Sequence, residues 1–99
     1  MTIRSERIGS GVQLFLCDRL DTAAAPMLEE KLQQLGDDIT DITLDLMELS
    51  YISSMGMRVL LQAHKTYAQQ GRKLVIRNMT DSVREVFEMT GFIKLIVLD

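Results

Sequence analysis

The sequence predicts an α/β fold in which helices pack against a mixed, mostly parallel β-sheet. Apolar residues alternate with polar ones in some segments, as in strands, and recur every three or four residues in others, as in helices. These segments follow one another in the order ββαβαβαβ, and two strands joined through one helix pair in parallel. At 99 residues, the chain is expected to form a single domain over residues 1–99.

The first half of the chain begins with a hairpin. A glycine-containing turn at residues 9–11 separates a weak edge strand from the more apolar segment 12–16. A helix follows, with leucines at helical spacing and polar residues between them. Asp21 or Thr22 can cap its first amides, and Gly36 is expected to end it.

The second half alternates strands and helices. The pattern predicts strands over residues 42–46, 73–77 and 93–97. An amphipathic helix is expected over residues 55–70, with Gly71 after it. Thr80 or Ser82 can cap a third helix that Gly91 ends. These elements complete the predicted order.

The composition excludes several classes of function. With 11 basic and 14 acidic residues the net charge is −3, so the chain lacks the basic surface that nucleic acid or anionic lipid requires. The lone Cys17 permits neither an internal disulfide nor a cysteine zinc site, and we expect it to be a buried small apolar residue. Charges at Arg4, Glu6 and Arg7 replace the apolar stretch of a signal peptide. We therefore expect a cytoplasmic protein without membrane insertion.

Two adjacent serines, Ser53 and Ser54, occupy the junction between a strand and the second helix. A serine there is most simply an N-cap, worth about 1 kcal/mol, but capping explains only one of the two. The same junction favours an anion, because the first amides and the positive end of the helix dipole point at it. A phosphoserine could be held there, and Arg58, one turn later, could pair with it.

Three motifs carry a family resemblance. They are Leu20-Asp21-Thr22-Ala23, then Leu44-Asp45-Leu46 leading to Tyr51-Ile52-Ser53-Ser54-Met55-Gly56-Met57-Arg58-Val59-Leu60, and finally Thr90-Gly91-Phe92. In this order and spacing the whole chain resembles the STAS family, named for sulfate transporters and anti-sigma-factor antagonists. The resemblance implies a mixed sheet with helices. It places Ser54 on the family's phosphoacceptor position, two residues before the glycine that Gly56 matches.

The motif departs from the family pattern on both sides of Ser54. The family often has Asp before the acceptor serine and Ser or Thr after it, whereas this chain has Ser53 and Met55. Ser53 therefore becomes an alternative acceptor. The surface expected to bind a partner comprises Asp21, Thr22, Ser53, Met55, Gly56 and Arg58. For Asp21, a purely structural role as a helix cap is an equally good interpretation.

The resemblance implies an anti-sigma-factor antagonist that works by partner switching. The unphosphorylated form would bind an anti-sigma factor with serine kinase activity and release a sigma factor, phosphorylation of Ser54 would end binding, and a serine phosphatase would reset the protein. Two other functions stay open. One is a non-switching structural subunit of a lipid-transport complex or signalling scaffold, and the other is a STAS sensor that binds a nucleotide or small ligand.

Nothing in the sequence predicts an enzyme or a cofactor. Ser54 and the only histidine, His64, lie ten residues apart on one predicted helix, roughly 15 Å along its axis. Neither a nucleophile-elbow pattern nor a P-loop is present. The acidic pairs Glu29-Glu30 and Asp37-Asp38 have no histidine partner, so we interpret them as solvated charges and assign no metal.

Overall fold

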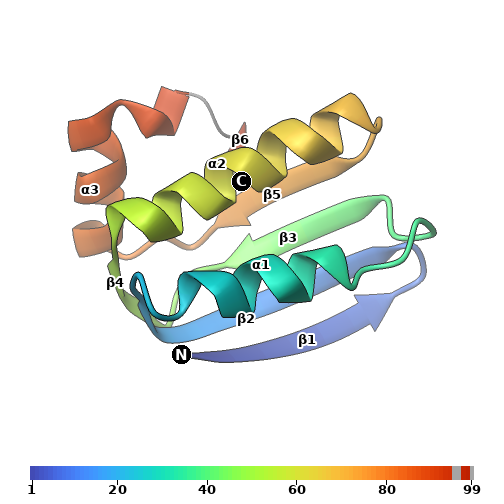
Figure 1. The fold of residues 1–99 in the computed structure, drawn as a ribbon, viewed down its shortest axis with the longest axis horizontal. Coiled ribbons are helices and arrows are strands. Elements are labelled where there is room, and N and C mark those ends of the chain that lie inside the picture. The colour runs from blue at the N-terminus through green and yellow to red at the C-terminus, as the bar shows by residue number, and fades with distance from the viewer. Residues whose placement is uncertain (95–96, 99) are drawn as a thin grey trace.

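The computed structural model describes residues 1–94 and 97–98 and confirms the predicted α/β class (Figure 1). The strands are β1 (Thr2–Ile8), β2 (Gly11–Leu20), β3 (Asp41–Asp45), β4 (Leu49–Ile52), β5 (Lys73–Arg77) and β6 (Val97–Leu98). The helices are α1 (Ala25–Gln33), α2 (Ser54–Gln69), α3 (Asp81–Thr90) and the 3₁₀ helix η1 (Phe92–Lys94).

The sheet is mixed, as predicted, and its strand order is β1-β2-β3-β5-β6. β1 and β2 form the antiparallel hairpin, whereas the β2–β3, β3–β5 and β5–β6 pairs are parallel. α1 and α2 lie side by side over one face of the sheet (Figure 1). Among the helices of the described residues, none has both the length and the apolar content needed to cross a membrane.

One hydrophobic core lies between the sheet and the helices α1, α2 and α3. Because side chains alternate along a strand, every second residue of β3 and β5, and of β2 from Val12 to Leu16, faces the helices, and these residues are buried. The apolar stripes of α1 and α2 cover them. The largest fully buried side chains of this core are Phe87, Leu14, Leu16, Leu20, Leu28, Ile42, Leu44, Leu46, Leu49, Met57, Leu60 and Ile76.

The predicted order ββαβαβαβ omitted a strand, β4, which pairs in parallel with the last residues of β2. β4 has only four residues, buried at both ends and exposed in the middle, so it lacks the alternation from which a strand is predicted. β2 also continues to Leu20, beyond the predicted end at residue 16. A register shift between Asp18 and Arg19 turns this extension toward β4, and Asp18 has a positive φ of 81° there.

Two element boundaries also differ from the prediction. α1 ends at Gln33, three residues before Gly36. Ile93 lies in η1 instead of a strand, because the backbone reverses at Gly91 (φ 77°) and the Lys94 amide donates to the Gly91 carbonyl at 3.3 Å. The predicted strand positions 95–96 lie outside the described residues.

Cys17 is not the buried apolar residue that we expected. It is only partly buried, and its thiol donates a hydrogen bond to Glu48, with Sγ 3.0 Å from Oε2. This hydrogen bond to a carboxylate raises the pKa of the thiol above its ordinary value. The neutral form of the thiol is therefore favoured over the thiolate.

The helix layer is tied together by a buried tyrosine, which gives a direct test of the packing. The Tyr67 side chain is 5% exposed, and its hydroxyl donates to the Leu32 carbonyl at 2.7 Å, joining α2 to α1. We expect Tyr67→Phe to lower the free energy of unfolding by about 1 kcal/mol. Tyr51→Phe is the matched control, because Tyr51 is 40% exposed and its hydroxyl has no partner among the described residues. Urea denaturation measures both variants. If Tyr67→Phe and Tyr51→Phe lowered the free energy of unfolding equally, this role of the Tyr67 hydroxyl would be contradicted.

Candidate functional site at the start of α2

The candidate site forms where two parallel strands end side by side. Leu20 at the end of β2 is the register partner of Ile52 at the end of β4. The Asp21–Ala24 turn follows the first strand, and Ser53 and α2 follow the second. Two segments that are about 30 residues apart in the sequence therefore meet at one edge of the molecule (Figure 1).

Gly56 allows the first turn of α2 to approach β2 closely. A Cβ atom at this position would lie 2.7 Å from the Leu20 carbonyl oxygen and 2.8 Å from Leu20 Cγ. Both distances are far shorter than ordinary van der Waals contact, so any larger residue must move the helix or the strand. Gly56 is buried, so its role is to position the start of α2 and it offers little surface to a partner.

Ser53 is the N-cap of α2. Its backbone is extended (φ −89°, ψ 168°), and its Oγ accepts a hydrogen bond from the Gly56 amide at 3.1 Å. Its own amide donates to the Leu20 carbonyl at 2.9 Å. Ser53 is thus fixed both to the helix and to the neighbouring strand, and the structure assigns the capping role to the first of the two serines.

Ser54 begins the helix and is exposed, and its hydroxyl has no hydrogen-bond partner among residues 1–94 and 97–98. Arg58 is also exposed and lies one turn further along α2, where side chains four residues apart are neighbours. Beside them, Met55 is 40% exposed whereas Met57 is 2% exposed. The first turn of α2 contains no acidic residue. A free hydroxyl, a nearby cation and the positive end of a helix therefore share one surface.

Asp21 and Thr22 lie next to this junction in different roles. The Asp21 carboxylate accepts from the Ala24 amide at 2.9 Å, so it stabilises the turn before α1. The prediction that Asp21 or Thr22 caps the helix directly is corrected, because the N-cap residue of α1 is Ala24, which makes no side-chain cap bond. Thr22 is exposed, and its hydroxyl has no partner in the part of the chain that the structure describes.

An exposed cation–aromatic pair, which the sequence did not predict, lies beside the site. The Arg19 guanidinium stacks on the Tyr51 ring, 4.2 Å from its centroid, and the two residues are register partners in β2 and β4. Neither residue could be paired from the sequence, because the extension of β2 and the existence of β4 were both needed to bring them together.

The structure does not bring the one histidine of the sequence to Ser54. His64 lies ten residues later on the same helix, about 15 Å along its axis, so the two side chains do not meet. In residues 1–94 and 97–98, no three His, Cys, Asp or Glu side chains converge to hold a metal ion.

Comparison with known protein families gives a match over nearly the whole chain. The model of the STAS domain matches residues 2–99. The anti-sigma-B factor antagonist of Bacillus subtilis is 30% identical over 80 residues, which cover 81% of this chain and 73% of that protein. The anti-sigma-B factor antagonist of Listeria monocytogenes is 31% identical over 93 residues, covering 92% and 81%.

Solved structures share the fold. The unphosphorylated anti-sigma-factor antagonist SpoIIAA superposes with a TM-score of 0.77 at 18% identity, covering 99% of this chain and 87% of its own. The phosphorylated form of SpoIIAA, a Bacillus cell-fate determinant, gives a TM-score of 0.76 at 19% identity, covering 99% and 91%. At these identities, the similarity establishes the fold alone.

The two serines can be distinguished by their effects on stability. Ser53→Ala removes the bond to the Gly56 amide and should lower the free energy of unfolding by about 1 kcal/mol. Ser54→Ala removes a free hydroxyl at the first helical position and should change it by less than about 0.5 kcal/mol. Urea denaturation of both variants measures the difference. A larger loss for Ser54→Ala would show that the capping roles are reversed.

Proposed function

The chain belongs to the STAS domain family, and on this basis we propose that it is an anti-sigma-factor antagonist that works by partner switching. In the unphosphorylated form it binds an anti-sigma factor with serine kinase activity, and a sigma factor is released. The kinase transfers the terminal phosphoryl group of ATP to the Ser54 hydroxyl, which yields phosphoserine and ADP and ends the binding. A serine phosphatase hydrolyses the phosphoserine and restores the first state.

The observation that supports this proposal is the difference between the Ser53 hydroxyl, which caps α2, and the Ser54 hydroxyl, which is free. Ser54 is exposed and free of hydrogen bonds within the described residues, so a kinase can reach it without breaking structure. Ser53 is half-buried, and its Oγ already holds the Gly56 amide. Ser54 is therefore the proposed acceptor, even though the residue before it is serine and not the family's aspartate.

Electrostatics explain how one phosphate ends binding. A phosphoserine adds between about 1.5 and 2 negative charges and three acceptor oxygens. At Ser54 these would lie next to the exposed Met55 side chain and near the turn held by Asp21. Arg58 and the first amides of α2 can hold the phosphate locally. The partner surface made by Asp21, Thr22, Ser53, Met55 and Arg58, and positioned by Gly56, would thus change from partly apolar to anionic.

The proposal includes the location and organisation of the protein. Because sigma factors act on RNA polymerase, the antagonist would work in the cytoplasm, with residues 1–99 as one STAS-like domain. It would be a binding regulator that serves as the substrate of the kinase and the phosphatase and catalyses no step itself.

The test is phosphorylation by the cognate anti-sigma kinase with ATP, followed by intact-mass spectrometry. The wild-type protein and Ser53→Ala should each gain one phosphate, and Ser54→Ala should gain none. In pull-down with the same kinase, Ser54→Ala should still bind and Ser54→Asp should not. A phosphate retained in Ser54→Ala would overturn the assignment of the acceptor. No phosphate on any form, from a kinase shown to be active on another antagonist, would favour a non-switching structural subunit.

A further inference from the structure

The strand β1 forms an open edge of the sheet. It stands first in the strand order β1-β2-β3-β5-β6, and β2 is its one partner among the described strands. In Figure 1 it is the outermost strand, and neither α1 nor α2 overlies it. Proteins commonly protect such edges with a proline, a β-bulge or a very short strand. β1 has none of these, because its seven residues include no proline and stay in register with β2 throughout.

Three residues of β1 direct their backbone groups outward. The Thr40 amide donates to the Ser10 carbonyl at 2.9 Å, on the β3 side, so the backbone groups of the next residue, Gly11, point to β1. Gly11 is the register partner of Ile8, and hydrogen-bonded pairs alternate along an antiparallel ladder. Every second residue from Ile8 back to Thr2 is therefore bonded to β2. The amides and carbonyls with no partner in the described part of the chain are those of Ile3, Ser5 and Arg7.

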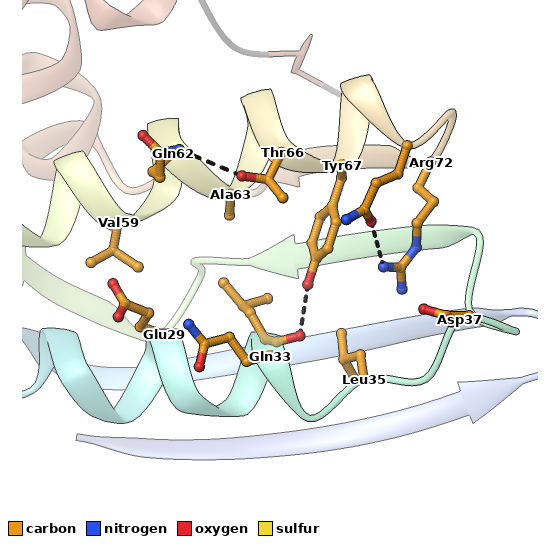
Figure 2. A pocket seen from close by; sticks show the side chains of 12 residues that line it. Glu29, Gln33, Leu35, Asp37, Val59, Gln62, Ala63, Thr66, Tyr67 and Arg72 are labelled. Atoms are coloured by element: carbon orange, nitrogen blue, oxygen red, sulfur yellow. Dashed lines mark hydrogen bonds between the residues drawn. The ribbon is translucent and has the colours of Figure 1, made fainter.

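The helix layer differs from this edge, because its polar groups bond to one another. In the hollow between α1 and α2, the Gln62 amide donates to the Thr66 hydroxyl at 3.5 Å, and the Tyr67 hydroxyl donates to the Leu32 carbonyl (Figure 2). The Arg72 guanidinium donates to two loop carbonyls there. The donors named on this face are thus already used, whereas the edge of β1 offers three amides and three carbonyls to a partner.

The open edge also carries opposite charges two residues apart. Arg4 and Glu6 lie on the sheet face away from the helices, because their register partners, Phe15 and Gln13, alternate with the buried residues of β2. Glu6 forms no ion pair with any residue the structure describes. Arg4 stacks on Phe15, and its Nη2 lies 3.5 Å from Glu48 Oε1. That ion pair is exposed and uses one nitrogen, so the guanidinium keeps donors for a second carboxylate.

Antiparallel pairing with β1 of a second copy matches these charges. The outward backbone groups bond to one another when the two-fold axis passes through Ser5, which places Ser5 opposite Ser5. Arg4 then lies opposite Glu6 of the partner subunit, twice, in the closer, non-hydrogen-bonded pairs. Moving the axis by one residue would place Arg4 opposite Arg4 or Glu6 opposite Glu6, and like charges directly opposite are destabilising. The charges therefore favour the register centred on Ser5.

This register also suits the other side chains of the strand. Ile8 is 76% exposed, and it would lie opposite Thr2 of the partner subunit, forming the β-branched type of pair that strands favour. Arg7 would lie opposite Ile3 of the partner subunit and could keep its ion pair with Asp38. No charged residue of β1 would meet a like charge directly across the pair.

From these features we propose that two copies of this chain form a dimer through antiparallel pairing of their β1 strands. One seven-residue edge is small beside the roughly 1,200 Å² that a standard stable interface buries, so the dimer is reversible and forms at high protein concentration. The start of β1 and the start of α2 lie at the same end of the molecule (Figure 1). The two Ser54 sites therefore lie at opposite ends of the dimer, away from the paired strands.

Sedimentation velocity of the full chain, from about 10 µM to about 1 mM, tests the proposal. The wild-type protein should change from monomer to dimer over this range. Arg4→Glu or Glu6→Arg alone should weaken the dimer by roughly tenfold, because each places like charges in both cross-strand pairs. An equimolar mixture of the two variants should recover the dimer, because one copy then carries two carboxylates and the other two guanidinium groups at the paired positions.

Three controls keep the proposal falsifiable. Ser5→Pro removes the central outward amide and should abolish the dimer, whereas Ser5→Ala should not; proline suits an edge position of this kind, and circular dichroism checks the fold. Glu85→Arg on α3 makes the same change of charge as Glu6→Arg and should leave dimerisation unchanged. Ser54→Ala should dimerise normally, so the result is independent of the proposed switch. A wild-type monomer at the highest concentration, a dimer of Ser5→Pro, or a mixture that stays monomeric would overturn the proposal.

Discussion

The close contact between the first turn of α2 and the end of β2 is the constraint on which the rest of the site depends. The Leu20 carbonyl accepts the Ser53 amide at 2.9 Å, and only a residue without Cβ fits against it at Gly56. This contact fixes where α2 begins relative to the strand. It therefore also fixes where Ser54, Met55 and Arg58 emerge on the surface, and it holds the turn after Leu20 beside them.

Ser53 and Ser54 are neighbours with the same side chain, but they have different roles at the start of α2. Ser53 is oriented inward because its extended backbone directs Oγ to the Gly56 amide, as in other N-caps. Ser54 takes the first helical position, and its side chain is left in solvent. The cap keeps the helix start ordered while the free hydroxyl stays open to modification. A charge added at Ser54 can thus alter the surface without dissolving the structure beneath it.

The helical and strand periodicities were sufficient to predict the α/β class, the initial hairpin and the parallel pairings. They were also sufficient for α2, whose buried stripe includes Gly56, Val59 and Leu60 as expected. The pattern could not reveal β4, because four residues with a polar middle carry no period. It could not decide which serine caps α2 either, since both suit an N-cap. That choice depends on the Leu20 contact, which joins residues distant in the sequence.

The contact between the first turn of α2 and the end of β2 is tested most directly by the free energy of unfolding of the Gly56→Ala variant. In an ordinary helix interior, this change stabilises by up to about 1 kcal/mol, because alanine has the higher helix propensity. Here the added Cβ meets the Leu20 carbonyl at 2.7 Å, and we predict a loss of about 1–3 kcal/mol instead. A gain in stability would contradict the account, because it would show that the first turn of α2 is not held against the end of β2.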